Sequence, residues 1–135
     1  MRFGQKAEEA AAIFLEGRGY KILERNYRTR LAEIDIIASC SDNLNSTFCI
    51  DALNQNTPCR DTLVFIEVKA RNSTRYGLPS EAVSVSKQKK IISAALHYLR
   101  EHKIADTRIR FDVMTMLFQN GHYQIKIIPN AFDGV

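Results

Sequence analysis

The sequence predicts an α/β fold in which one β-sheet carries helices on its faces. Two helical stretches and five extended stretches alternate in the order helix, three strands, helix and two strands. The 135 residues are 45% hydrophobic and 25% charged, which are ordinary values for a globular chain of this length. We therefore expect a single domain over residues 1–135.

The first half of the chain is expected to form one helix and three strands. Residues 4–17 are rich in alanine and contain no proline, which favours a helix. The sequence Gly17-Arg18-Gly19 suits the end of this helix, because glycine readily takes a positive φ. Apolar residues at strand spacing predict β-strands over residues 20–27, 32–39 and 63–70.

A long polar segment, residues 39–61, separates the second and third strands. It shows no hydrophobic period and is rich in Ser, Asn, Asp and Thr, apart from a short apolar stretch at residues 48–53. We expect a loop insertion, which would either gate a substrate or be a tolerated surface addition. We favour the surface addition.

The second half is expected to add one helix and a β-hairpin. Residues 108–118 read as a strand, Asn120-Gly121 is a strong signal for a tight hairpin turn, and residues 123–128 return as a strand before a short tail. Residues 86–102 read as a helix with an apolar stripe at helical spacing. The expected stripe is Gln88, Ile91, Ile92, Ala95, Leu96 and Leu99.

The third strand carries Glu67 and Lys69 on one face, together with Leu63 and Phe65. A buried carboxylate beside a buried ammonium is unfavourable unless the pair is fully hydrogen-bonded or binds something. An exposed cross-strand ion pair is the alternative, but it suits this strongly apolar strand less well. The opposite face is expected to hold Val64, Ile66 and Val68.

Asp35 lies among isoleucines in the second strand. If the two strands pair, Asp35 and Glu67 become neighbours on one face, where two partly dry carboxylates repel each other and a divalent cation relieves the repulsion. Such oxygen ligands suit Mg²⁺ or Mn²⁺, and Lys69 could orient a water or offset charge on a phosphoryl oxygen. Glu33 and Ile37 are expected on the face of Asp35, and Ile34, Ile36 and Ala38 on the other.

Glu8 is a fourth candidate. It shares a stripe of the first helix with Ala11, Ala12 and Leu15, which directs its carboxylate toward the core or its edge. The alternative is a first-turn carboxylate stabilised by the helix dipole.

The net charge of +4 permits a polyanionic partner without requiring one. Arginines flank the Asp35 strand, and a second basic group follows Glu67 toward the second helix. Contacts of these side chains to a nucleic-acid backbone would be independent of sequence, although a solvated helix face is the alternative for the lysines. The candidates are Arg28, Arg30, Arg71, Arg75, Lys87, Lys89 and Lys90.

No export signal or membrane-spanning run is evident, because Glu8 and Glu9 interrupt the N-terminal segment. We expect a cytoplasmic protein that does not associate with membranes.

Several segments in one order resemble the YraN-type family of small uncharacterised bacterial proteins. They are EEAAAIFLEGRGYKILERNYRTR, AEIDIIA, LVFIEVKAR, YGLPSEAVSVSKQKKI, RIRFDVMTM and the terminal NAF. AEIDIIA and LVFIEVKAR also resemble the PD-(D/E)-x-K nuclease superfamily. The pattern of helix acid, strand Asp and E-x-K is similar to that of archaeal Holliday junction resolvases, which act as two-fold dimers. The resemblance therefore admits a homodimer.

The resemblance implies a restriction-endonuclease-like fold, with an αβββαβ core and a central mixed sheet flanked by helices. It implies that Asp35, Glu67 and the Val68 carbonyl bind Mg²⁺ or Mn²⁺, that Lys69 positions the attacking water, and that Glu8 helps to hold metal or water. The activity implied is metal-dependent hydrolysis of phosphodiesters in DNA, including branched or structured DNA.

Two departures keep other functions open. Ala32 stands where the family usually has glycine, and residues 39–61 replace a short turn. The alternatives are a nucleic-acid-binding module without catalysis, and an interaction protein that keeps the nuclease fold.

Overall fold

The computed structural model describes residues 3–41, 61–72 and 82–134. The predicted order of helices and strands is confirmed, while the apolar stretch at 48–53 and Arg75 lie outside the described residues. The elements are α1 (Phe3–Gly17), β1 (Lys21–Arg28), β2 (Glu33–Ser41), β3 (Asp61–Arg71), α2 (Val85–Glu101), β4 (Arg108–Gln119) and β5 (His122–Phe132).

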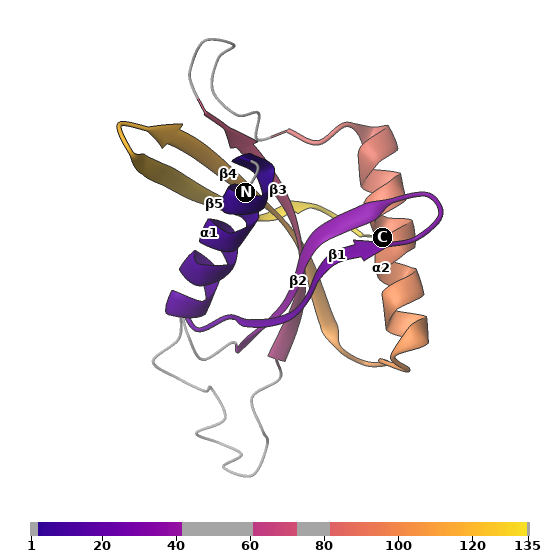
Figure 1. Cartoon of the computed structure of the whole chain (residues 1–135). Coiled ribbons are helices and arrows are strands. Elements are labelled where there is room, and N and C mark those ends of the chain that lie inside the picture. The colour runs from indigo at the N-terminus through magenta and orange to yellow at the C-terminus, as the bar shows by residue number, and fades with distance from the viewer. Residues whose placement is uncertain (1–2, 42–60, 73–81, 135) are drawn as a thin grey trace.

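The strands form one mixed sheet in the order β1-β2-β3-β4-β5. All neighbouring strands are antiparallel except β3 and β4, which are parallel because α2 carries the chain back between them. The two helices lie on opposite faces of the sheet (Figure 1). Neither of these helices is both long and apolar enough to cross a membrane.

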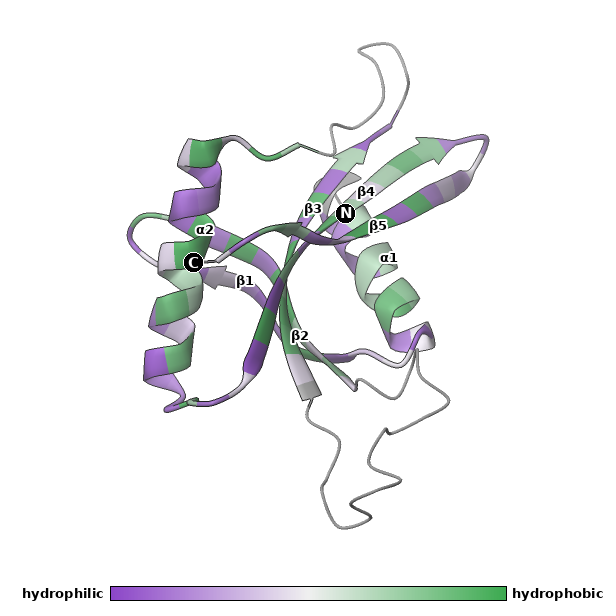
Figure 2. Ribbon diagram, turned by 180° about the vertical axis from the view of Figure 1, so that it is seen from behind, coloured by the Kyte–Doolittle hydropathy of each residue, from purple (hydrophilic) through white to green (hydrophobic). Residues whose placement is uncertain are grey.

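Each helix buries its apolar stripe against one face of the sheet, and hydrophobic and polar residues accordingly alternate around both helices (Figure 2). Ala11 and Leu15 of α1 pack on Ile36, Val64 and other residues of β2 to β4. On the opposite face, α2 packs on an aromatic cluster. Its members include Phe65, Tyr98, Phe111 and Phe132.

The prediction for Ile34 was wrong. Ile34 is 1% exposed and packs with Tyr27 and Ile37 on the α2 side, not with Ile36 on the α1 side. The reason is that pairing between β2 and β3 ends at Ile36 and Ile66, so the start of β2 is held only by β1 and turns relative to the sheet.

The prediction for Leu96 was also wrong. Leu96 is 47% exposed, because the buried stripe of α2 is centred on Ile91, Ala94, Ala95 and Tyr98. The helical spacing of apolar residues in the sequence therefore included one residue, Leu96, that does not belong to the buried stripe.

The last strand continues beyond its predicted end to Phe132, which pairs with Phe111. A β-bulge between Ile128 and Phe132 makes this possible, with Asn130 at φ 53°. The Asn130 amide donates to Asp112 Oδ1 at 2.9 Å instead of to a strand. Arg110 donates to the same buried carboxylate at 2.9 and 2.8 Å. A fully bonded ion pair therefore fixes the end of the sheet.

Replacing Asp112 by alanine should destabilise the protein by about 3–5 kcal/mol, because it leaves a backbone amide without its acceptor and a partly buried guanidinium with the Tyr20 hydroxyl in place of its carboxylate. Urea unfolding at pH 7 measures the change. Asp133→Ala, at an exposed position nearby, is the control and should stay within about 0.5 kcal/mol of the native chain. A loss below about 1 kcal/mol for Asp112→Ala would contradict this account.

Candidate active site

The candidate site lies where β2 and β3 part. Their antiparallel register runs from Ser41 opposite Asp61 to Ile36 opposite Ile66, and one step further along it places Asp35 opposite Glu67. There the strands separate, and Asp35 Oδ2 accepts a hydrogen bond from the Val68 amide at 2.8 Å. The carboxylate thus accepts the Val68 amide, which would otherwise lack a partner because the pairing between β2 and β3 has ended.

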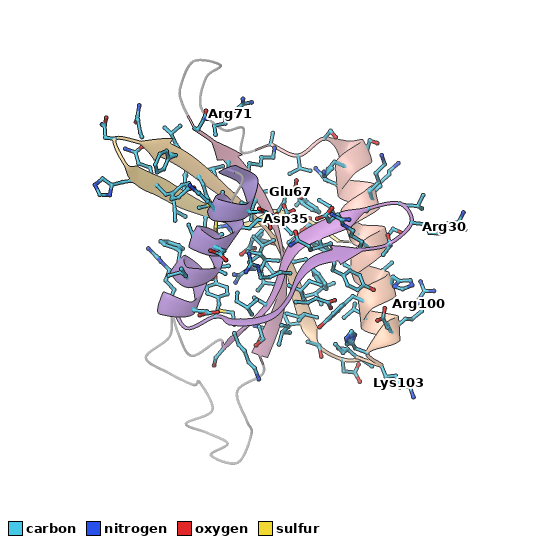
Figure 3. All side chains as sticks on the ribbon, viewed as in Figure 1. Arg30, Asp35, Glu67, Arg71, Arg100 and Lys103 are labelled. Carbon is cyan, nitrogen blue, oxygen red and sulfur yellow. The ribbon has the colours of Figure 1, made fainter. Side chains whose placement is uncertain are left out.

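The Asp35 carboxyl is hard to ionise in this position. Burial is the main cause, and the neighbouring carboxylate of Glu67 is the second; together they raise the pKa of Asp35 to about 7, with Glu8 and Glu33 adding smaller repulsion. The Val68 hydrogen bond acts in the opposite direction but does not cancel them. The side chains of Asp35 and Glu67 lie together between the two helices (Figure 3).

Glu8 reaches this site from the other layer of the fold. The α1 stripe that buries Ala7, Ala11 and Leu15 also turns Glu8 toward the sheet. Its Oε2 accepts a hydrogen bond from Asn26 Nδ2 of β1 at 3.2 Å. Asn26 has φ 54°, a left-handed conformation that asparagine tolerates better than most residues. Glu8 therefore lies near enough to add a small repulsion to Asp35, but it does not complete a group of three carboxylates with Asp35 and Glu67.

Two lysines lie at the α2 side of the site, and they have different partners. Lys69 Nζ donates to the carbonyl of Ala82, just before α2. Lys87 Nζ lies 3.5 Å from Glu67 Oε1, with the Glu67 side chain 13% exposed and that of Lys87 52% exposed. The Ser84 hydroxyl caps α2 by accepting the Lys87 amide, which fixes the first turn of the helix beside the acids.

The contact of Lys87 with Glu67 was not foreseen from the sequence, which offered Lys87 only as a nucleic-acid contact. The available signal was its place three residues after a serine cap, in the helix that follows the E-x-K strand.

The remaining basic candidates are spread over the surface. Arg28 pairs with Glu33 at 3.2 Å, and Arg30 lies at the tip of the β1–β2 hairpin. Arg71 ends β3 and is exposed, as are Lys89 and Lys90 on α2. Of the predicted cations that the structure describes, Lys87 contacts an acid and Lys69 bonds to Ala82 near the start of α2; Arg75 lies outside the described residues.

Ala32 fits its place without strain. Its φ is not positive, and its amide donates to Thr29 Oγ1 at 3.2 Å within the hairpin turn. The alanine therefore does not disturb the backbone that leads to Asp35.

Asp35 and Glu67 are the side chains that could hold a divalent cation, beside the Val68 backbone. Within the described ranges, no three His, Cys, Asp or Glu side chains are grouped closely enough to form a site by themselves. The Asp35 and Glu67 carboxylates are still suitable ligands for Mg²⁺. This ion often binds only one or two protein carboxylates and completes its coordination shell with water and substrate oxygens.

The raised pKa of Asp35 predicts a stability change with pH. The folded state holds a proton that the unfolded state releases, so this contribution is present in full below about pH 4 and is lost as the pH rises through about 7. Asp35→Asn keeps an acceptor for Val68 and removes the repulsion. Above pH 7 it should therefore be more stable than the native chain and unfold at a higher temperature. Each unit by which the pKa of Asp35 is raised corresponds to about 1.4 kcal/mol of free energy of unfolding.

Thermal melts from pH 4 to 8 check this expectation, with Asp133→Asn as the control for loss of an exposed charge. The two curves should converge near pH 4. A lower melting temperature for Asp35→Asn at pH 8 would show that the carboxylate is better compensated than its surroundings indicate.

Comparison with known proteins assigns the chain to a family. Residues 7–116 match the uncharacterised protein family UPF0102. A UPF0102 protein of Desulforapulum autotrophicum is 45% identical over 98% of this chain and 93% of its own length. One from Geobacter metallireducens is 42% identical over 96% of this chain and 91% of its own.

Among solved structures, Pyrococcus furiosus SfsA in complex with Ca²⁺ aligns with 89% of this chain and 57% of its own, at 14% identity and a TM-score of 0.28. A likeness this weak carries no argument about the site. The family match and the sequence relatives establish the family alone: the protein is a member of the UPF0102 family.

Proposed function

We propose that this protein is a nuclease that hydrolyses phosphodiester bonds in DNA with a bound Mg²⁺ or Mn²⁺. The observation that carries the proposal is the meeting of Asp35 and Glu67 where β2 and β3 part, with Lys69 on the same side. Structural acids are normally compensated by several donors, whereas these two carboxylates repel each other. Such a pair suits a site that acquires a cation.

The arrangement of the elements supports a restriction-endonuclease-like fold for this nuclease. A helix precedes three antiparallel strands, and a second helix leads to a strand parallel to the third. This is the αβββαβ order that we expect of that fold. The acids lie at the separation of its second and third strands.

Each residue has a role in the proposed reaction. Asp35 and Glu67 would bind the cation with the Val68 carbonyl, and the cation would polarise a phosphoryl oxygen and lower the pKa of a bound water. Lys69 would leave the Ala82 carbonyl to hold the attacking water and to offset charge that develops on the phosphate. Glu8, oriented by Asn26, would accept a hydrogen bond from a water at the edge of the site.

DNA is the proposed partner because exposed cations lie on the elements next to the acids. Arg71, Lys89 and Lys90 are exposed near the end of β3 and the start of α2, where a phosphate backbone could contact them without regard to sequence. Branched or structured DNA and a homodimeric form belong to the proposal through the likeness to resolvases.

A second candidate function has one observation in its favour. Lys87 already lies on Glu67, so an ammonium supplies part of the positive charge that a metal would bring. If Lys87 always occupies the place of the metal ion, the protein would be a binding module that holds nucleic acid without cutting it.

The nuclease proposal predicts cleavage that depends on the E-x-K residues. We expect cutting in a labelled panel of duplex, single-stranded, flap and four-way-junction DNA with Mn²⁺ or Mg²⁺. Glu67→Gln and Lys69→Met should each lower the rate by about 10²-fold or more, because one removes a metal ligand and the other a charge on the phosphate. Lys21→Met, at the far end of β1, is the matched control. Absence of cutting by folded, metal-bound native protein would overturn the proposal.

Lys87 distinguishes the two candidate functions. In the nuclease, a cation competes with Lys87 for Glu67, so Lys87→Gln should tighten Mn²⁺ binding about two- to fivefold, the value of a partly exposed ion pair. Isothermal titration calorimetry measures this, with Lys90→Gln as the control. The silent module would bind no Mn²⁺, and Lys87→Gln would only lower its melting temperature by leaving Glu67 unpaired.

A further inference from the structure

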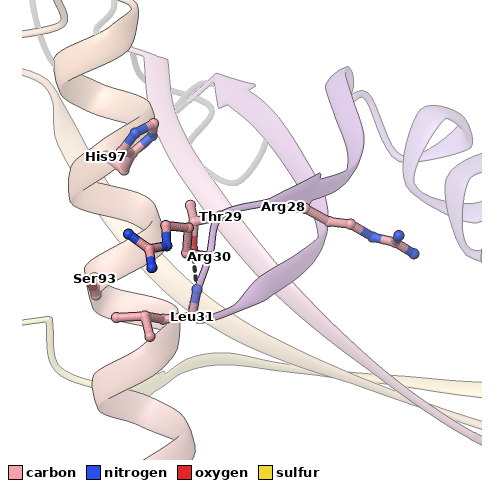
Figure 4. A pocket seen from close by; sticks show the side chains of 6 residues that line it. All are labelled: Arg28, Thr29, Arg30, Leu31, Ser93 and His97. Atoms are coloured by element: carbon pink, nitrogen blue, oxygen red, sulfur yellow. Dashed lines mark hydrogen bonds between the residues drawn. The ribbon is translucent and has the colours of Figure 1, made fainter.

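We propose that a pocket between the β1–β2 hairpin and α2 binds a backbone phosphate of a nucleic acid that extends from the acidic site. This inference rests on the proposed function and names a second contact for the same substrate. The pocket has a volume of about 450 Å³. It is lined by Arg28, Thr29, Arg30, Leu31, Ser93 and His97 (Figure 4).

Arg30 supplies the charge of this pocket. Its guanidinium turns toward α2, whereas Arg28 points away and pairs with Glu33 (Figure 4). Within the part of the chain that the structure describes, Arg30 makes no recorded hydrogen bond or ion pair. An arginine held next to a cavity without a carboxylate partner is suited to an anion, and its planar fork matches phosphate oxygens.

The hairpin turn holds Arg30 in place. The Thr29 amide donates to the Ala32 carbonyl at 2.8 Å, and Thr29 Oγ1 accepts the amides of Leu31 and Ala32 at 3.3 and 3.2 Å. Because these backbone groups are bonded within the turn, the backbone position from which the Arg30 side chain extends does not depend on a ligand. Such preorganisation lowers the entropy lost on binding.

The opposite wall offers Ser93 and an oriented His97. His97 Nδ1 lies 2.6 Å from Tyr27 Oη and 3.4 Å from Glu101 Oε2, and the Tyr27 hydroxyl donates to Glu101 at 2.9 Å. Burial and the Glu101 hydrogen bond raise the pKa of Tyr27 to about 12, so the hydroxyl keeps the proton it donates. The Glu101 carboxylate is thereby engaged, and the close Tyr27 Oη requires His97 Nδ1 to donate, so Nε2 donates to a phosphate only when both ring nitrogens carry a proton.

The size and lining of the pocket favour a nucleotide unit over a free phosphate ion. A volume of this size falls in the range of about 300–1,000 Å³ that holds small organic ligands. Leu31 is 71% exposed and adds an apolar wall on which a sugar or base can pack. A bare phosphate ion would use neither feature.

A polar and basic stripe of α2 connects the pocket to the acids. Lys87, Lys90, Ser93 and His97 recur at helical spacing along one side of the helix. Lys87 contacts Glu67, and His97 lies about 15 Å further along α2 at 1.5 Å per residue. At 3.4 Å per nucleotide of one DNA strand, this distance corresponds to roughly four to five nucleotides of a duplex. One backbone can thus contact both sites.

The test measures DNA binding without metal, so that cleavage plays no part. Fluorescence anisotropy of a labelled duplex and a labelled single strand in EDTA would compare Arg30→Ala and Ser93→Asp with two matched controls. Arg18→Ala removes the same charge at the end of α1, on the opposite face of the sheet. Ser93→Asn adds nearly the same atoms as Ser93→Asp but no negative charge. Melting temperatures establish that every variant is folded.

Arg30→Ala and Ser93→Asp should each weaken binding by roughly three- to tenfold, and Arg30→Ala should reduce the slope of log affinity against log salt by about 0.9. Arg18→Ala and Ser93→Asn should bind as the native chain does. If Arg30→Ala and Ser93→Asp match their controls while native protein binds DNA, the pocket is not a phosphate site and the nuclease proposal stands. If native protein binds neither DNA in EDTA, the pocket proposal falls, and the cleavage assay with metal decides the nuclease proposal separately.

Discussion

The hydrogen bond from the Val68 amide to Asp35 is the contact on which the candidate site depends. It lies where two strands stop pairing, and it satisfies a backbone donor there with a carboxylate instead of a carbonyl. The same bond holds Asp35 beside Glu67 in a partly buried position, which raises its pKa. The sheet can therefore open at this point without an unpaired amide, and the opening acquires negative charge.

A comparison of Asp35 with Asp112 separates an acid of the candidate site from a structural one. Asp112 is fully buried, but it accepts two hydrogen bonds from Arg110 and one from the Asn130 amide, so its charge is neutralised locally. Asp35 has one amide donor and carboxylates as neighbours. The bonds of Asp112 hold the ends of β4 and β5 together. The carboxylates of Asp35 and Glu67 repel each other, and a cation can relieve this repulsion.

The second helix links the features that bear on function. Its capped first turn brings Lys87 to Glu67, its buried face holds the aromatic cluster, and its exposed side passes Ser93 and His97 at the hairpin pocket. Arg30 faces that side from the hairpin that leads directly into β2. The proposed polyanion surface would run from the acids along this helix to the pocket.

Local pattern by itself determined the order of the elements, the Asn120-Gly121 turn and the common face of Glu67 and Lys69, because strand and helix periods are properties of neighbouring residues. Those periods also brought Asp35 and Glu67 together once the two strands paired. Only the tertiary structure decided where that pairing ends and which helical turn lands beside the acids. The side taken by Ile34, the bulge at Asn130 and the contact of Lys87 with Glu67 follow from long-range register, which no local period contains.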